Sequence, residues 1–440
     1  MDELAPSIKV DLSYALISVG STAIWSVLSG WLLYFYLPPE GEGQALVPAA
    51  FYGLVMLAVR SVNAVIALPI GYLSDNTRTR WGRRLPFMFV SALPMLAFFA
   101  LLWRPPVQGT STWNLIYLGV ILLLYNVAYT LNQIPYTALL PEIALTERHR
   151  IRISAWSSGG FLVGMIVGGV GGPVIDRLGF ATATLLYAVV ALPLFYLPIL
   201  VLRERPGQRS EAAQRLDFRE GVRMMFRNRA FRVMTATGLC YWGVTTIVQA
   251  VIPFIVTEIC LLSKSDTFDF YIPALLASLL CYPAVTWLSN RFGKWRVFAG
   301  SLLASALVLP GLICIGPGLP MGLKTQGLIW VTVQAVVMSG VTMLPPAFGA
   351  EITDYDEELT GERREGIYYA TWGFLDQVTQ GVAAAVLPLI LFLGRSHTDP
   401  QGPVGVRVVG LLGGALMLMA FLIFLKYPLR GKPGTQGGGA

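Results

Sequence analysis

The chain has 440 residues, of which 55% are hydrophobic and only 13% are charged. A soluble globular protein carries roughly 25% charged residues, so this composition excludes an ordinary soluble domain. The formal net charge is +7, but Lys and Arg stand between apolar segments. A nucleic-acid partner is therefore not expected, because it would need a basic face or tail.

Twelve apolar runs follow one another along the chain. The first residues, MDELAPSIKVD, lack the cationic region and cleavage site of a secretory signal, so we expect the first run to remain as a span. A span needs about 20 mostly apolar residues and must be helical, because lipid leaves backbone groups no other partner. The sequence predicts an all-α integral membrane protein with twelve transmembrane helices, centred near residues 24, 60, 95, 126, 163, 190, 244, 279, 305, 338, 380 and 416.

The loops between these runs differ in charge. If the N-terminus is cytoplasmic, most of the 32 Lys and Arg residues fall in cytoplasmic segments. Short cytoplasmic loops are enriched in Lys and Arg. We therefore expect a multi-pass protein of the cell (inner) membrane with both termini in the cytoplasm.

A long polar segment divides the chain into two halves. Residues 1–202 and 231–430 hold six spans each, and residues 203–230 lie between them. The stretch RLDFREGVRMMFRNRAF in this linker predicts an amphipathic helix at the cytoplasmic membrane surface. The tail, residues 431–440, reads GKPGTQGGGA and has the composition of a disordered end.

The two halves repeat each other. LSDNTRTRWGRR after the second span is echoed by LSNRFGKWR after the eighth, and PEIALTERHR after the fourth by AEITDYDEELTGERR after the tenth. Ser74 thus matches Ser289 and Glu142 matches Glu351, at nearly the same separation along the chain. Two parallel six-helix repeats with a site between them are the layout of major facilitator transporters.

Several motifs resemble one family within that superfamily. GYLSD followed by GRR looks like the superfamily motif between the second and third helices, with four extra residues inserted. TRTRWGRR, QIPYTALLPEI and DYDEELTGERREGIYYATWGF together resemble the glycoside-pentoside-hexuronide symporters, the melibiose permease-like family. LSYALISVG and FRNRAF extend the resemblance over nearly the whole chain.

This resemblance implies a cation-coupled carrier of glycosides, in which carboxylates on the first, second and fourth helices bind the cation and the sugar. The sequence departs from that pattern. At the positions where the family often has acids, this chain has Thr22, Asn63, Ala67 and Gln133. At the position on the eleventh helix that can be lysine in the family, it has Gln377. The sodium site is therefore not carried over, and we expect the proton as the coupling ion, if there is one.

Polar residues at helical spacing form stripes on three predicted spans. Such residues are costly in a membrane and usually face a bundle interior or a wet cavity. Amides, hydroxyls and aromatic rings suit a polyhydroxylated solute. The alternative is that they join helices through interhelical hydrogen bonds. The candidate cavity residues on these spans are Thr22 and Trp25, then Asn126, Tyr129, Gln133 and Thr137, then Trp372, Asp376, Gln377 and Gln380, to which the second span adds Arg60 and Asn63.

Two charges fall near the middle of predicted spans. Arg60 lies in the second span and Asp376 in the eleventh. An unpaired charge at that depth costs at least a few kcal/mol. We expect the two to meet across the central cavity, with Asp376 as a protonatable coupling group whose pKa depends on Arg60 and on solute. The alternatives are a permanent structural ion pair and an Asp376 that reaches cytoplasmic water.

A second group of charges lies in the predicted cytoplasmic loops. These charges resemble the inner gate of the superfamily, which closes when the cavity faces outward. The alternative is that the arginines only set the topology. The candidate gate residues are Asp75, Arg83, Arg84 and Glu142 in the first half, and Glu351, Asp354 and Arg363 in the second.

Glycines recur every fourth residue in the fifth span, at Gly160, Gly164, Gly168 and Gly172. This stripe predicts close helix packing, although glycine-rich fifth helices also resemble the antiporter motif of drug exporters. The four cysteines show no C-x-x-C spacing, and the sequence contains no nucleotide loop, metal cluster or nucleophile motif. We therefore expect no enzyme, no metal and no cofactor.

The sequence favours a secondary active transporter that carries a sugar or glycoside-like small-molecule solute by alternating access. Lipid or another amphiphile is an alternative cargo. A non-transport membrane assembly factor with the same fold is a second alternative. We expect membrane lipid as the surrounding partner and a monomer as the working form.

Overall fold

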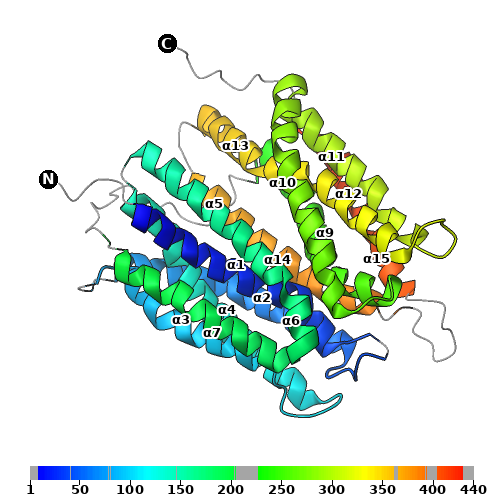
Figure 1. Cartoon of the computed structure of the whole chain (residues 1–440). Helices are drawn as coiled ribbons and strands as arrows, with labels where there is room; N and C mark the ends of the chain where they lie inside the picture. Colours follow the sequence, from blue (N-terminus) through cyan, green and yellow to red (C-terminus); the bar gives the residue numbers. More distant parts are fainter. Residues whose placement is uncertain are drawn as a thin grey trace. The chain divides into compact units, whose positions relative to one another are not determined.

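The computed structural model describes residues 8–39, 41–77, 79, 81–144, 146–202, 204, 226–360, 365–391, 393 and 404–429. Within these ranges the chain is almost wholly helical (Figure 1). Eleven helices are long and apolar enough to cross a membrane, and a shorter apolar helix spans Leu85–Leu101. The predicted all-α membrane fold is confirmed. The predicted linker helix lies largely outside the described residues, and the tail lies wholly outside them.

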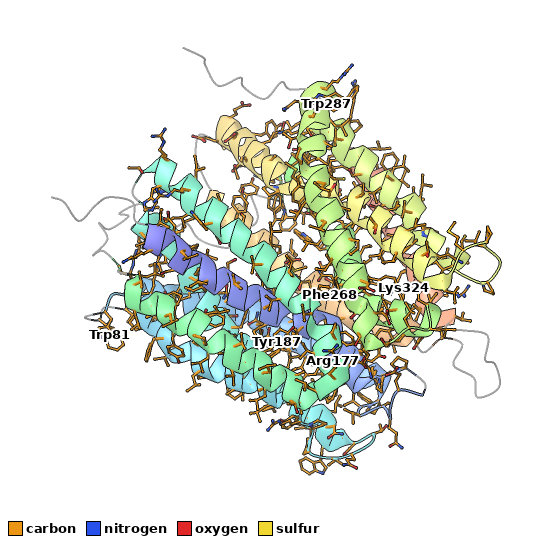
Figure 2. All side chains as sticks on the ribbon, in the orientation of Figure 1. Trp81, Arg177, Tyr187, Phe268, Trp287 and Lys324 are labelled. Carbon is orange, nitrogen blue, oxygen red and sulfur yellow. The ribbon has the colours of Figure 1, made fainter. Side chains whose placement is uncertain are left out.

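The chain divides into two compact units. Unit 1 comprises residues 1–211, 249–271 and 384–389. In it, α1 packs against α5 and α7, α3 against α4 and α7, and α2 against α4. Tyr187 of α7 donates a hydrogen bond to Val167 O of α5 at 2.6 Å (Figure 2). The helices of the first part of unit 1 are α1 (Ile8–Tyr36), α2 (Ala49–Asn76), α3 (Leu85–Leu101), α4 (Thr112–Ile143), α5 (Glu147–Gly169), α6 (Gly171–Leu178) and α7 (Phe180–Val201).

Three of the four glycines in the predicted stripe lie where α5 meets α1. The fourth, Gly172, lies in α6, and a β-carbon there would meet Thr267 Oγ1 and Lys264 O. A β-carbon placed on Gly160 would lie 2.5 Å from Ala15 O, and one on Gly164 would lie 2.7 Å from Thr22 Cβ. One on Gly168 would lie 2.5 Å from Ser26 Cβ. Because glycine has no side chain, the backbones of α5 and α1 can approach closely. The prediction of close packing is confirmed.

The turn between α9 (Arg229–Phe254) and α10 (Thr267–Phe292) also belongs to unit 1. It contains a π-helical turn, η1 (Ile255–Ile259), and a 3₁₀ turn, η2 (Lys264–Asp266). Lys264 Nζ lies 2.5 Å from Glu42 Oε2, and Ser265 Oγ donates to Asp176 Oδ2 at 2.7 Å. Unit 1 therefore extends beyond the predicted first half because this turn is held by side chains of the α1–α2 loop and α6.

Unit 2 comprises residues 212–248, 272–383 and 390–440. Here α11 packs against α12 and α15, and α15 also packs against η3. Besides parts of α9, α10 and α14 (Glu365–Leu391), the elements are α11 (Lys294–Val308), the 3₁₀ turn η3 (Leu309–Cys314), α12 (Leu323–Met343), α13 (Pro345–Thr360) and α15 (Val404–Phe424).

The internal repeat is visible in one pair of buried amides. Asn114, near the start of α4, accepts a hydrogen bond from Val107 N at 3.1 Å and donates to Val107 O at 2.9 Å. Gln326, near the start of α12, accepts from Gly316 N at 2.9 Å and donates to Gly316 O at 3.0 Å. Each amide thus satisfies the backbone of the loop before its helix. The corresponding helices of the two halves begin in the same way.

We expect Gly164→Ala to destabilise the protein, although Ala normally favours a helix over Gly. Its methyl group would meet α1 backbone and Thr22, and overpacking of this kind costs about 1–3 kcal/mol. The measurement is the midpoint of thermal unfolding in detergent. Gly159→Ala is the matched control, because nothing lies within 4 Å of a β-carbon there. An equal midpoint for both variants would contradict the packing.

Candidate functional site

Arg60 lies near the middle of the 28-residue α2. Its charge acts on the phenol groups of Tyr52, Tyr125 and Tyr129. Tyr125 and Tyr129 stand one turn apart on α4, and their rings stack with centroids 5.9 Å apart. Unit 1 therefore places a guanidinium within electrostatic range of three phenols in the middle of a predicted span.

The sequence prediction included Arg60 and Tyr129 but missed Tyr52 and Tyr125. Tyr125 is 2% exposed, and its hydroxyl has no hydrogen-bond partner among the described residues. A buried hydroxyl without a partner costs free energy unless something else satisfies it. The position of Tyr125 one turn before Tyr129 was the signal in the sequence.

Other predicted residues of α2 and α4 make hydrogen bonds inside unit 1. Thr130 Oγ1 donates to Asn63 Oδ1 at 2.8 Å, which joins the two helices. Asn126 Nδ2 donates to Leu122 O at 2.8 Å within α4. Gln133 Nε2 reaches Asn132 Oδ1 at 3.4 Å, and Thr137 Oγ1 donates to Gln133 O at 3.1 Å. These bonds support interhelical and local roles, and a role in lining a cavity stays a prediction.

Polar residues of the predicted α1 stripe also contact a neighbouring helix. Ser18 Oγ donates to Ser157 O of α5 at 3.0 Å, and Thr22 lies against Gly164. These two residues join α1 to α5, as the structural alternative expected. Trp25 is half-buried.

Asp376 lies in α14, in the part that belongs to unit 2. Gln380, one turn further along, donates from Nε2 to Asp376 Oδ2 at 2.9 Å. The carboxylate also acts electrostatically on Tyr241 of α9. Gln377 is half-buried beside it. Arg60 and Asp376 belong to different units, and their pairing stays a prediction.

Trp372 is held more firmly than the other predicted residues of α14. Its Nε1 donates to Thr235 Oγ1 at 2.9 Å, and its ring stacks on Phe231 with centroids 5.7 Å apart. The indole N–H is thus already engaged with α9. A solute would meet the ring of Trp372 rather than its donor.

At the predicted cytoplasmic end of unit 1, the candidate gate arginines share one carboxylate. Arg83 Nε donates to Glu142 Oε1 at 2.9 Å, and Arg84 Nη2 lies 3.2 Å from the same oxygen. The side chain of Asp75 lies outside the described parts of the chain. The described ion pairs of these arginines join α4 to the start of α3.

Glu204 is a member of this cluster that the sequence analysis missed. It accepts backbone N–H groups from Arg83, Arg84 and Leu85, at 2.7 Å for Arg84. These amides lie at the N-terminal end of α3, where a negative charge is favourable. Gly82 has φ of +107° and lies against this carboxylate, so a side chain is disfavoured there. Glu204 was missed because it stands in what reads as a linker.

Unit 2 repeats the arrangement with different residues. Lys294 Nζ lies 3.0 Å from Glu351 Oε2, and the Tyr427 hydroxyl donates to the same oxygen at 3.2 Å. Burial, and then the charge of Glu351, raises the pKa of the Tyr427 phenol, so it stays a donor at neutral pH. Asp354 is exposed, and Arg363 lies outside the described residues. Lys294 stands in the echo LSNRFGKWR, which was the signal for it.

A buried carboxylate at the N-terminal end of α1 was also missed. Asp11 is fully buried, with Arg152 Nε 2.6 Å from Oδ2 and His149 Nε2 2.9 Å from Oδ1. Both partners come from α5, more than a hundred residues away in the chain. Nothing near Asp11 in the sequence indicates them.

One known protein family matches nearly the whole chain. The family described as MFS/sugar transport protein matches residues 13–430. The chain belongs to this family. The predicted family resemblance is therefore confirmed.

Three curated relatives cover most of the chain. The isoprimeverose transporter of Lactiplantibacillus pentosus is 26% identical over 402 residues, which are 87% of this chain and 79% of the relative. The glucuronide carrier protein homolog of Escherichia coli (strain K12) is 24% identical over 436 residues, 96% of this chain and 92% of the relative. The putative sulfoquinovose importer of Salmonella typhimurium is 23% identical, over 88% of this chain and 81% of the relative.

Solved structures share the fold. The nucleoside transporter NupG aligns with a TM-score of 0.64 at 14% identity, over 95% of this chain and 100% of that one. A bacterial homolog of the human lysosomal transporter Spinster, inward-facing and unoccupied, aligns with a TM-score of 0.65 at 11% identity, over 95% of each chain. At these identities the likeness establishes the transporter fold alone.

We expect Glu204→Gln to lower the thermal midpoint, because a neutral amide accepts hydrogen bonds from the N–H groups at the start of α3 more weakly. Loss of a charged helix cap costs about 1 kcal/mol. The midpoint should fall by a few degrees. Asp354→Asn, which removes an exposed carboxylate, is the control and should leave the midpoint unchanged. A midpoint equal to wild type in Glu204→Gln would contradict the capping role.

Proposed function

We propose that this protein is a secondary transporter that moves a sugar or glycoside-like solute across the cell (inner) membrane by alternating access. The observation that carries the proposal is the family match from residue 13 to 430, within which the relatives named above are transporters of sugars and glycosides. The Arg60 guanidinium and the phenols near it support the proposal, because a guanidinium donates hydrogen bonds to hydroxyls and a phenol both donates and accepts them. A membrane carrier with this ancestry is not an enzyme.

The membrane topology, the oligomeric state and the coupling ion are further parts of the proposal. Both termini face the cytoplasm, the working form is a monomer, and the two predicted halves rock about the solute. The proton is the coupling ion, because the acids of the family's sodium site are replaced in this chain. Neither a lipid cargo nor an assembly role is favoured, since the relatives named above carry soluble solutes.

A thermal-shift screen of the purified protein against sugars, glycosides, glucuronides and lysolipids tests the substrate class. We expect a polar glycoside to raise the midpoint by several degrees, because a ligand that binds only the folded state stabilises it. Arg60→Gln should remove most of that shift. Arg104 is an exposed basic residue in the loop after α3, so Arg104→Gln is the matched control and should keep the shift. A shift from lysolipids alone would overturn the proposed cargo.

Asp376→Asn tests the proposed coupling. In proteoliposomes, an inward proton gradient should drive solute uptake by the wild type and not by this variant, because the amide cannot take up a proton. Solute binding, measured by thermal shift, should persist. A sodium gradient at equal pH should drive neither protein. Undiminished proton-driven uptake in Asp376→Asn would remove this residue from the coupling role.

A further inference from the structure

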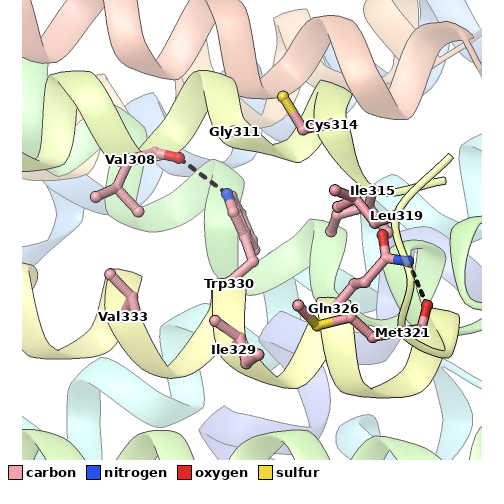
Figure 3. A pocket seen from close by; sticks show the side chains of 10 residues that line it. All are labelled: Val308, Gly311, Cys314, Ile315, Leu319, Met321, Gln326, Ile329, Trp330 and Val333. Atoms are coloured by element: carbon pink, nitrogen blue, oxygen red, sulfur yellow. Dashed lines mark hydrogen bonds between the residues drawn. The ribbon is translucent and has the colours of Figure 1, made fainter.

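A groove lies between η3 and α12 in unit 2. The helix α11 ends at Val308, and the chain continues through Pro310 and Gly311 as a 3₁₀ turn. Trp330 Nε1 donates to Val308 O at 2.9 Å, which sets the ring across this break (Figure 3). Because Gly311 has no side chain, the space beside the Trp330 ring stays open. The resulting cavity has a volume of about 240 Å³.

The groove offers almost nothing for a hydrogen bond. The N–H of Trp330 is already donated to Val308 O. The amide of Gln326 is engaged at both ends, since it accepts from Gly316 N and donates to Gly316 O and to Met321 O at 2.7 Å. The remaining lining is aliphatic apart from the thiol of Cys314 and the thioether of Met321. A polar solute would lose its hydration here without compensation, whereas a hydrocarbon chain would not.

The rim of the groove faces outward from the helices. Ile329 is 49% exposed and Val333 is 40% exposed. Both α12 and the helix formed by α11 and η3 are long and apolar enough to cross a membrane. In a membrane these side chains meet lipid hydrocarbon, so the groove opens into the bilayer.

A cation stands at the η3 end of the groove. Arg407, in the first turn of α15, donates from Nη1 to Ile313 O at 3.1 Å, directly beside Cys314 of the lining. Its Nη2 lies 4.0 Å from a β-carbon built on Gly316. The sequence contains no Asp or Glu from residue 301 to 350 or from 404 to 424. The elements around Arg407, which are η3, α12 and α15, thus carry no acid, and a guanidinium retains donors suited to a phosphate.

We propose that this groove is a binding site for an anionic phospholipid. One acyl chain lies between η3 and α12 against the face of Trp330. The phosphate of the headgroup lies at Arg407, where charge is complementary. The site belongs to unit 2 alone and does not depend on which solute the protein carries.

Quenching of Trp330 fluorescence by brominated lipids tests the proposal on the full-length protein. The Trp330 signal is the difference between wild type and Trp330→Phe in bilayers of stated composition. Acyl-brominated phosphatidylglycerol should half-quench this signal at a mole fraction several-fold lower than acyl-brominated phosphatidylcholine. Arg407→Gln should abolish that difference, and Arg407→Lys should retain part of it. Gly311→Leu should fill the groove and remove quenching by both lipids.

Trp113 is the control, because it is 69% exposed in unit 1 and should be quenched alike by both lipids in every variant. Equal quenching of Trp330 by the two lipids, unchanged in Arg407→Gln, would overturn the headgroup site. Quenching that survives in Gly311→Leu would overturn occupation of the groove. If Gly311→Leu does not fold, Gly311→Ala provides the smaller filling and should weaken quenching. Unchanged quenching in that variant would count against the proposal in the same way.

Discussion

The structure depends on one constraint: inside a bilayer the backbone finds no water, so each N–H and C=O group must be paired within the protein. Long helices satisfy this requirement, and each described break in a helix is repaired locally. After η1, Cys260 N donates to Ile255 O at 2.9 Å and Leu262 N to Val256 O at 3.0 Å. At the start of η3, the Trp330 indole supplies a donor for Val308 O. Departures from α-helix therefore occur where a substitute partner exists.

A charged side chain inside a bilayer is likewise costly, so most charges lie at the ends of the helices and few lie near their middle. In both halves an acid in the predicted cytoplasmic part of the fourth span is paired with a base at the start of the third, as Glu142 with Arg84 and Glu351, within α13, with Lys294. The residue types differ, but the arrangement is the same. Arg60 and Asp376 are exceptions in mid-helix, and their cost is the reason to assign them a function. The repeat explains the scaffold, and a site at Arg60 and Asp376 stays a prediction.

The sequence was sufficient for the spans, the repeat and the family, because each rests on local patterns of composition. It was sufficient for the α5 glycines because a four-residue spacing defines a helix face. It was insufficient where partners are distant in the chain, as for Asp11 with His149 and Arg152. Glu204 was missed because a capping carboxylate looks like linker charge. The α1 stripe was ambiguous because α1 is buried over most of its surface, so a polar face does not single out a cavity.

Solute counterflow in proteoliposomes tests the central claim most directly. Vesicles are loaded with an excess of the unlabelled solute that stabilises the protein, and a trace of labelled solute is added outside without any ion gradient. An alternating-access carrier should transiently concentrate the label inside above its outside level, and the label should then return to equilibrium. A label that never rises above equilibrium, for every solute that binds, would contradict the assignment of this protein as a secondary transporter.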